Sequence, residues 1–234
     1  MSTTTVRPNV VPADPVTRRR IGAIGIVLII SNVIATPGGV LWPEPSGGGE
    51  TYSYADIQPL RDRWWGLLVV LSISGILGVA AQAFLTGYLV RGRGAGWATT
   101  GGFLMWIGIA FQAVGVGGLA ATYYVATGVD ATTGGVVIGT ANDDLLHLFG
   151  PMLAGALMVA VGTVLQVVGL WRSHAVPRWV PLLVLFIVIS FVVPGNGWIG
   201  LAVQIPMAAG AIAVAYYAWR RAAVGSQGRS AVRA

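Results

Sequence analysis

Six long apolar runs constrain the fold of this chain more than any other feature of its sequence. They lie at about residues 21–42, 64–90, 97–125, 145–171, 179–194 and 198–219, and the fifth is the shortest. A helix needs about 20 apolar residues to cross the hydrocarbon core of a bilayer. Tryptophans stand at the ends of these runs, as expected for an aromatic belt at the membrane surface. The sequence therefore predicts an all-α polytopic bundle of six transmembrane helices.

The charge content also indicates a membrane protein. Only 9% of the 234 residues are charged and 55% are hydrophobic, whereas soluble domains contain about 25% charged residues. Lipid must therefore cover much of the surface, and a 24.3 kDa chain leaves no room for a second folded domain. We expect one transmembrane domain over residues 21–221. The segments 1–20 and 222–234 are rich in Ser, Thr, Gly, Pro or Arg and are expected to be disordered cytoplasmic tails.

The distribution of charge predicts the orientation of the helices. If the N-terminus is cytoplasmic, every arginine except Arg61 and Arg63 lies on the cytoplasmic side, and every acidic residue except Asp14 lies outside. Cytoplasmic loops carry an excess of Lys and Arg, so both termini are predicted to be cytoplasmic. The use of arginine without lysine, together with abundant Ala, Gly and Val, is typical of a GC-rich bacterial genome. We therefore expect a multi-pass protein of a bacterial plasma membrane.

Missing residue types exclude several chemistries. The chain has no cysteine, which excludes disulfides and thiol catalysis, and no lysine, which excludes Schiff-base chemistry and a Walker-type phosphate loop. The net charge of +6 comes from arginines beside the apolar runs rather than from one basic face, so no nucleic-acid partner is expected. No Arg, Asp or Glu lies near the middle of a predicted helix, which disfavours proton-coupled transport and ion pumping. No cofactor or metal is expected.

Small residues predict which two helices lie closest together. Glycines recur every seven residues in the third run (Gly101, Gly108, Gly115) and in the fourth (Gly155, Gly162, Gly169). A period of seven keeps each stripe on one face of a left-handed crossing. Because helices in lipid approach closely only where their residues are small, we expect these two helices to pack along their glycine stripes.

Amide side chains lie at depth in every apolar run except the fifth. They are Asn32, Gln82, Gln112, Gln166 and Gln204. Such amides commonly hydrogen-bond between helices, each contributing about 0.6 to 2 kcal/mol. Alternatively, they line a polar cavity or a pathway for a small neutral solute, which requires that they face one lumen.

The start of the fourth run holds the residues with acid–base chemistry. In "TANDDLLHLFGP", residues 140–151, Asn142 is expected to cap the helix, and Asp143 and Asp144 fall in its first turn, where the helix dipole favours negative charge. His147 lies one turn further along, on the side of Asp144 or Asp143. The group is either a capped helix start or a catalytic site, in which an Asp–His pair acts as general acid and base.

A second group of outer residues is a candidate for ligand binding. It comprises Arg61, Asp62, Arg63, Trp64 and Trp65 from "LRDRWW", together with Asn196 and Trp198. An arginine in this position can hold an anionic headgroup while the indoles lie at the membrane interface. Alternatively, these residues only anchor the helix ends at the membrane interface.

The segment "GLWRSHAVPRWVPLL", Gly169–Leu183, joins two apolar runs through a short Arg-Ser…Pro-Arg turn. In this plan the second to sixth helices resemble those of small, uncharacterised six-helix integral membrane proteins of actinobacteria. That resemblance implies a six-helix fold and no particular activity. The chain is also similar in plan to small multi-helix terpene cyclases, which protonate isoprenoids with membrane carboxylates. It departs from them because no acidic residue lies within a run.

Three functions fit these observations. The first is the binding of a lipid or an apolar small molecule, or service as a partner subunit through the outer face. The second is an enzyme that uses the Asp–His pair on a lipid-soluble substrate such as an isoprenoid. The third is a permease for a small neutral solute. Membrane lipids are the expected partners, and a protein partner or a second copy of the chain is a further candidate.

Overall fold

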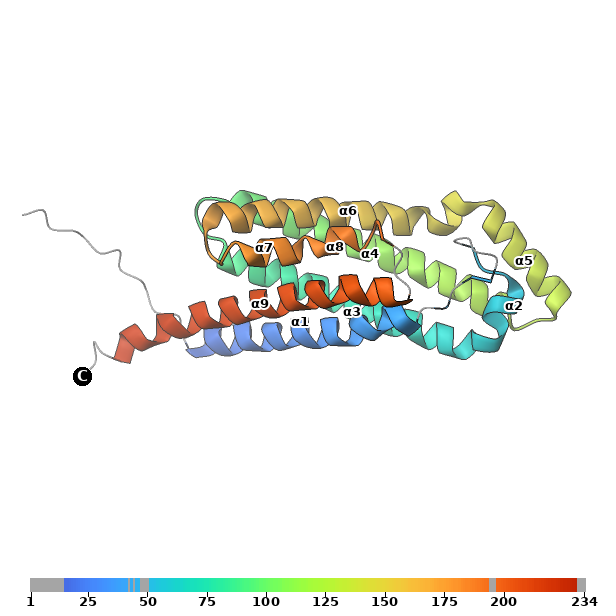
Figure 1. Ribbon diagram of the computed structural model, residues 1–234, viewed down its shortest axis with the longest axis horizontal. Coiled ribbons are helices and arrows are strands. Elements are labelled where there is room, and N and C mark those ends of the chain that lie inside the picture. Colours follow the sequence, from blue (N-terminus) through green and yellow to red (C-terminus); the bar gives the residue numbers. More distant parts are fainter. Residues whose placement is uncertain (1–14, 42, 44, 47–50, 194–196, 231–234) are drawn as a thin grey trace, which may run out of the picture.

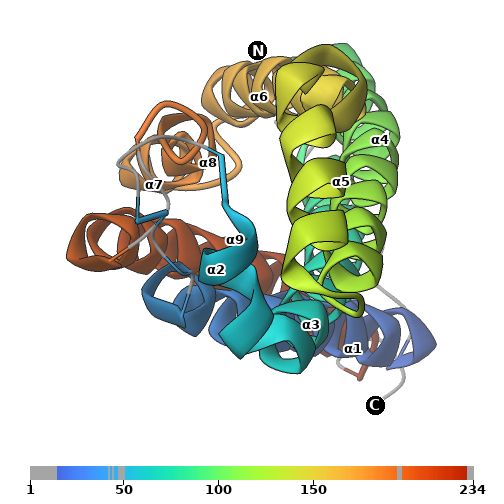
Figure 2. The same ribbon diagram turned by 90° about the vertical axis from the view of Figure 1, so that its right-hand side faces the viewer.

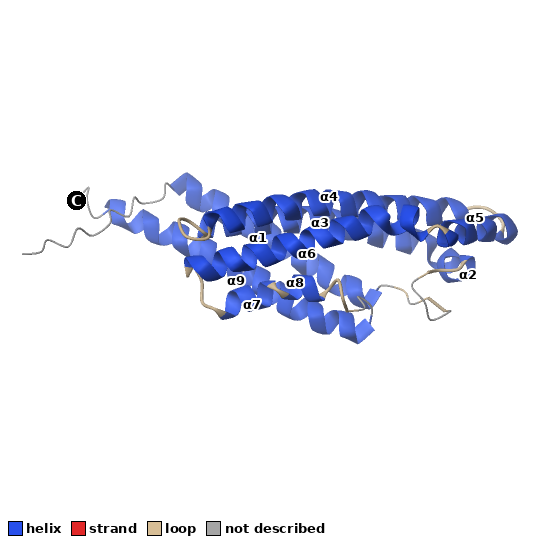
Figure 3. Cartoon of the chain, turned by 90° about the horizontal axis from the view of Figure 1, so that it is seen from above, coloured by secondary structure: helices blue, strands red, loops and turns tan. Residues whose placement is uncertain are grey.

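The protein consists of helices joined by loops and turns in the part that its computed structural model describes, which is residues 15–41, 43, 45–46, 51–193 and 197–230. No strand occurs in these residues (Figure 3), so the all-α prediction is confirmed. The helices are α1 (Pro15–Leu41), α2 (Tyr54–Ile57), α3 (Arg61–Leu89), α4 (Ala95–Ala126), α5 (Ala131–Asp143), α6 (Leu145–Ser173), α7 (Trp179–Val184), α8 (Phe186–Ile189) and α9 (Gly197–Ser230).

Five of the predicted spans form helices that are long and apolar enough to cross a membrane. They cover Pro15–Gly38, Tyr54–Leu89, Ala95–Ala126, Leu145–Ser173 and Trp198–Ala223, with mean hydropathies between 1.8 and 2.2. Their length and composition are those of a membrane-embedded protein.

The fifth apolar run forms an irregular segment instead of one long helix. Its apolar helical part covers only Trp179–Ile189, and α7 and α8 are separated at Leu185. Beyond this break, several backbone bonds join residues three apart, as from Val188 N to Leu185 O (2.9 Å) and from Val192 N to Ile189 O (3.0 Å). Bonds that join residues four apart occur beside them, as from Ser190 N to Phe186 O (3.0 Å), so the segment is wound irregularly. The run consists largely of Val, Ile and Phe, which favour the α-helix less than Ala or Leu does.

The long helices form a ring in which each contacts its neighbours. In order around the ring, α6 contacts α4, α4 contacts α3, α3 contacts α1, and α1 contacts α9. The α7–α8 segment lies between α9 and α6 and closes the ring (Figures 1 and 2). The start of α1 and the end of α9 lie at one end of the bundle, whereas α2 and α5 lie at the other.

The predicted contact between the two glycine stripes is confirmed. A Cβ atom built on Gly108 would lie 2.7 Å from the carbonyl oxygen of Gly155, and one built on Gly101 would lie 2.5 Å from that of Gly162. At Gly115 the nearest backbone atom would be the nitrogen of Met152, at 2.6 Å. Real Cβ atoms do not come so close, so only glycine lets the backbones of α4 and α6 approach in this way.

The helices extend further than the sequence boundaries predicted. Helix α1 already begins at Pro15, and α9 continues to Ser230. Residues 15–20 and 222–230, which the sequence placed in disordered tails, are therefore helical. Arg, Ala and Gln make up much of these segments, and these are good helix formers. The remaining tail residues lie outside the described part of the chain.

Candidate functional site

Asp144 and His147 form a side-chain pair at the start of α6. The Nδ1 atom of His147 lies 2.8 Å from Oδ1 of Asp144, and the same oxygen accepts a hydrogen bond from the His147 backbone N–H at 3.4 Å. Hydrogen bonding to the His147 side chain and then to its backbone lowers the pKa of the Asp144 carboxyl below its ordinary value. Of the two partners that the sequence left open for His147, Asp144 and Asp143, the structure pairs it with Asp144.

This pair lies on the surface. The side chain of His147 is 84% exposed and that of Asp144 is 58% exposed, and Asp143 is exposed as the last residue of α5. Neither partner lines either of the cavities described below. Among the described residues, no three His, Asp or Glu side chains are grouped closely enough to hold a metal ion. The geometry is that of an N-cap, in which a carboxylate accepts the free amide groups of the first turn.

Asn142 does not cap α6, contrary to the sequence prediction. The cap is Asp144, because the chain before it is helical as α5 and Asn142 lies in the last turn of that helix. The Asn142 amide instead donates to the backbone oxygen of Tyr52 (3.0 Å) and accepts from the Tyr123 hydroxyl (3.2 Å). It thereby ties α5 to α4 and to the segment before α2. Partners so distant in the chain leave no local signal in the sequence.

Arg61 and Trp64 are held by protein contacts at the outer end of the bundle. Arg61 donates from Nε to the backbone oxygen of Tyr124 (3.1 Å), and its guanidinium lies 3.7 Å from the centre of the Tyr124 ring. Trp64 is buried against Tyr52, with 4.8 Å between the ring centres. These contacts assign both residues to joining α3, α4 and the outer segment, as cation–π and aromatic pairs commonly do.

The other residues predicted to bind a ligand do not converge on one place. Arg63 and Trp64 line a crevice of about 10 Å³, which holds one water molecule at most. Asp62 and Trp65 are exposed on α3, and Trp198 is 81% exposed at the start of α9. Asn196 lies outside the described residues. The outer face therefore shows scattered interfacial residues rather than one binding site.

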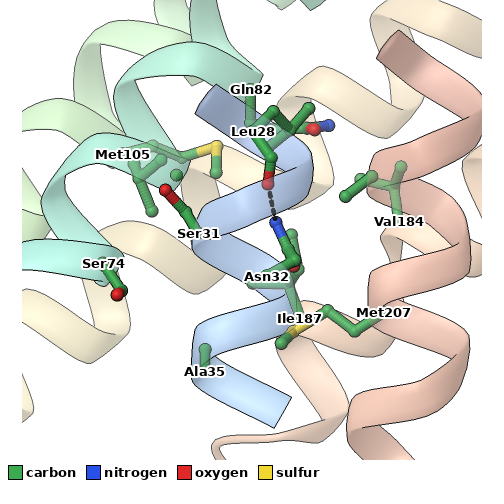
Figure 4. A pocket seen from close by; sticks show the side chains of 14 residues that line it. Leu28, Ser31, Asn32, Ala35, Ser74, Gln82, Met105, Val184, Ile187 and Met207 are labelled. Atoms are coloured by element: carbon green, nitrogen blue, oxygen red, sulfur yellow. Dashed lines mark hydrogen bonds between the residues drawn. The ribbon is translucent and has the colours of Figure 1, made fainter. Parts of the chain in front are cut away.

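A larger, half-open cavity lies between the helices of the bundle, and no pattern in the sequence predicted it. Its volume is about 120 Å³, and it is lined by residues of α1, α3, α4, α7, α8 and α9 (Figure 4). The lining residues are Leu28, Ser31, Asn32, Ala35, Ser74, Gly75, Gly78, Val79, Gln82, Met105, Val184, Ile187, Met207 and Ala211. An engineered cavity of about 150 Å³ in a soluble protein binds benzene, so this space is suited to a small ring or a segment of chain.

Small residues and the irregular segment together produce the cavity. Ala35, Gly75 and Ala211 present little or no side chain to it. At Gly78, a built Cβ would lie 3.2 Å from Cβ of Ser31, so α1 and α3 are close at that level. Val184 and Ile187, which stand on either side of the break between α7 and α8, form part of the wall.

Two of the five predicted amides line this cavity. Asn32 donates from Nδ2 to the backbone oxygen of Leu28 (2.9 Å), and Gln82 donates from Nε2 to the Thr86 hydroxyl at 3.5 Å. Each of these bonds joins two residues of the same helix. The two amides therefore do not form the hydrogen bonds between helices that the sequence predicted. Gln112, Gln166 and Gln204 are not among the lining residues. The five amides therefore do not face one lumen.

Comparison with known proteins assigns the chain to no family. No family model, curated protein or solved structure matches it. Its function is therefore inferred from the geometry of the cavity and of the outer face.

Proposed function

We propose that this protein is a six-pass membrane protein that binds a lipid or an apolar small molecule inside its helical bundle. The cavity between α1, α3, α4, α7–α8 and α9 carries the proposal. Protein interiors are packed as densely as organic crystals, with few voids larger than a water molecule. A half-open space of about 120 Å³ between the helices, walled mainly by apolar side chains, is suited to the binding of an apolar ligand.

The six-pass topology is supported by the path of the chain. The start of α1 and the end of α9 lie at the same end of the bundle (Figure 1), which requires an even number of crossings. The α7–α8 segment then makes the sixth crossing, because it packs between α9 and α6, two of the long helices. The arginines of the Arg91–Arg93 and Arg172–Arg178 turns support cytoplasmic termini in a bacterial plasma membrane.

Native mass spectrometry with a cavity-filling variant tests the proposal. Ala211 lines the cavity and is buried, whereas Ala209 lies on the same helix and is exposed. Protein released from gently extracted membranes should carry a reproducible extra mass. We expect Ala211→Leu to lose that mass, because its side chain occupies the cavity, and Ala209→Leu to keep it. A bare wild-type protein, or a mass that survives Ala211→Leu, contradicts the proposal.

A second candidate function rests on the Asp144–His147 contact of 2.8 Å. A carboxylate held against an imidazole can transfer a proton to and from a substrate, so the pair would act on a lipid-soluble molecule at the membrane surface. The same mass spectra separate the two candidates. Loss of the extra mass in Asp144→Asn or His147→Ala, with retention in Ala211→Leu, favours a reaction site at the start of α6.

A further inference from the structure

We infer that the ligand of the cavity is a neutral molecule that presents a hydroxyl group to the side-chain amide of Gln82. The inference rests on the function proposed above and narrows it to one class of ligand, an alcohol with an apolar body. Gln82 projects from α3 into the cavity beside Leu28 of α1 (Figure 4).

The amide of Gln82 is only partly satisfied by the protein. Its side chain is 3% exposed, and among the described residues its Oε1 atom has no hydrogen-bond partner. Its only protein bond, to the Thr86 hydroxyl, is long at 3.5 Å. A buried polar group without a partner destabilises the fold and is uncommon in native proteins. A group within the cavity is therefore expected to complete its bonding.

A hydroxyl is the group that fits this amide in either orientation. The oxygen and nitrogen of a glutamine amide are assigned from the surrounding bonds. If Oε1 faces the cavity, a ligand hydroxyl donates to it; if Nε2 faces the cavity, the same hydroxyl accepts from it. A ketone or an ether can only accept a hydrogen bond, so it pairs with this amide only if Nε2 faces the cavity.

The lining excludes a charged headgroup. No Arg, Asp, Glu or His is among the fourteen lining residues, and the other polar ones are Ser31, Asn32 and Ser74. An ionised group moved from water into such a site loses its hydration without gaining a counter-charge. The rest of the wall, formed by side chains such as Met105, Val184, Ile187 and Met207, suits an apolar body.

Water is the competing occupant. A cavity of about 120 Å³ has room for about four water molecules at about 30 Å³ each, and water can pair with Gln82 as well. Water and an alcohol must therefore be distinguished by a measurement on the protein as it leaves the membrane. The native mass spectra identify the natural occupant, because a cavity filled by water alone leaves the protein without an extra organic mass, whereas a bound alcohol adds its own mass.

Two fluorinated probes that differ in one hydroxyl test the inference, namely fluorobenzene and 4-fluorophenol. Their binding to the purified full-length protein is followed by ¹⁹F NMR and corrected for partition into protein-free micelles. We expect 4-fluorophenol to bind about tenfold more tightly, the effect of about one additional hydrogen bond to a buried acceptor. Gln82→Leu should abolish this preference while leaving fluorobenzene binding within about twofold. Gln112→Leu, on α4 outside the lining, is the matched control and should keep the preference.

The outcomes separate this inference from the proposed function. Equal binding of the two probes to the wild-type protein overturns the hydroxyl assignment and leaves the apolar cavity in place. If neither probe binds, both the hydroxyl assignment and the proposed binding function are wrong. The wild-type comparison stands even if Gln82→Leu fails to fold. Competition with 1-dodecanol against dodecane identifies the source: displacement by the long alcohol alone indicates a membrane lipid, and displacement by neither indicates a small free alcohol.

Discussion

Gln166 is a fully buried amide in the bundle. It is 0% exposed between α4 and α6, and in the described structure neither atom of its amide has a hydrogen-bond partner. A Cβ atom built on Gly102 would lie 3.2 Å from its Nε2, so the amide fills space beside the glycine stripe. The sequence predicted an amide at depth here, but the predicted bond between helices is absent among these residues. Gln166 therefore contributes packing at an energetic cost.

Replacing Gln166 with methionine, which has a similar length, should stabilise the protein. The change removes two unpaired polar atoms, so we expect a gain of up to about 1–3 kcal/mol in unfolding free energy and a higher Tm in detergent. Gln112→Met, at a partly exposed amide, is the control and should change the Tm little. A loss of stability in Gln166→Met would show that a water molecule or another group satisfies this amide.

Individual residues also show where sequence reasoning succeeds and where it stops. The Asp144–His147 contact follows from a spacing of three residues along one helix, and the glycine stripes follow from a period of seven; both are local patterns. The sequence assigns Asn142 to the start of the fourth apolar run, whereas it lies in the last turn of α5, and its partners, Tyr52 and Tyr123, are far away in the chain. The cavity depends on how six separate segments meet, which no local pattern encodes.

At the scale of helices, the α4–α6 pair is the closest contact in the bundle, and its tolerance to mutation can be measured within one helix. In Gly108→Ala, the new Cβ would lie 2.7 Å from the carbonyl oxygen of Gly155, which forces the helices apart. We expect a loss of about 1–3 kcal/mol, as for overpacked cores. At Gly117 of the same helix a built Cβ meets nothing within 4 Å. Gly117→Ala should therefore be neutral or stabilising by up to about 1 kcal/mol, and equal effects of the two changes in thermal unfolding would contradict the close packing.

Helix α5 depends on its cap. The side chain of Asp130 accepts hydrogen bonds from the backbone N–H groups of Thr132 (3.1 Å) and Thr133 (3.0 Å). These bonds, the one to Thr133 first, lower the pKa of Asp130 below its ordinary value of 3.8. Because the folded pKa is the lower one, the stabilisation is complete above about pH 3.8 and is lost as the pH falls through the folded value.

A spin label on α5 should report this loss. The chain has no cysteine, so Thr140→Cys, at an exposed position, can be labelled alone. We expect its nitroxide to become more mobile as the pH falls below about 3.8. Asn caps helices as well as Asp does and does not titrate, so the step should vanish in Asp130→Asn. An unchanged step in that variant would assign the transition to another group.

For the whole molecule, the number of crossings depends on the α7–α8 segment. Five helices have the length of a membrane span, and only a sixth crossing returns the end of α9 to the side from which α1 starts. Single cysteines and a membrane-impermeant maleimide test this in intact cells. Ala131→Cys, at the start of α5, should react from outside, whereas Ser173→Cys and Arg220→Cys should react only after lysis. Outside labelling of Arg220→Cys would show that α7–α8 does not cross.

The overall architecture was largely predictable because apolar length is a property of each segment alone. The five long helices and the all-α fold follow from it. The fifth run met the same criterion by composition, yet it forms α7, α8 and a series of tight turns up to Val193. Its winding follows from tertiary contacts with α6 and α9 as well as from its β-branched residues. Hydropathy depends only on which residues a segment contains, so it does not predict whether the segment forms a regular helix.

The cavity also gives the folded protein a mechanical property. A half-open space of about 120 Å³ is not filled by protein atoms, and unfolding eliminates the part of it that solvent and lipid leave unfilled. Native states with internal voids lose stability under hydrostatic pressure, since the unfolded chain and its solvent together take up less room. A bound ligand removes this difference by filling the void. The protein with a bound ligand should therefore unfold at a higher pressure than the protein with an empty cavity.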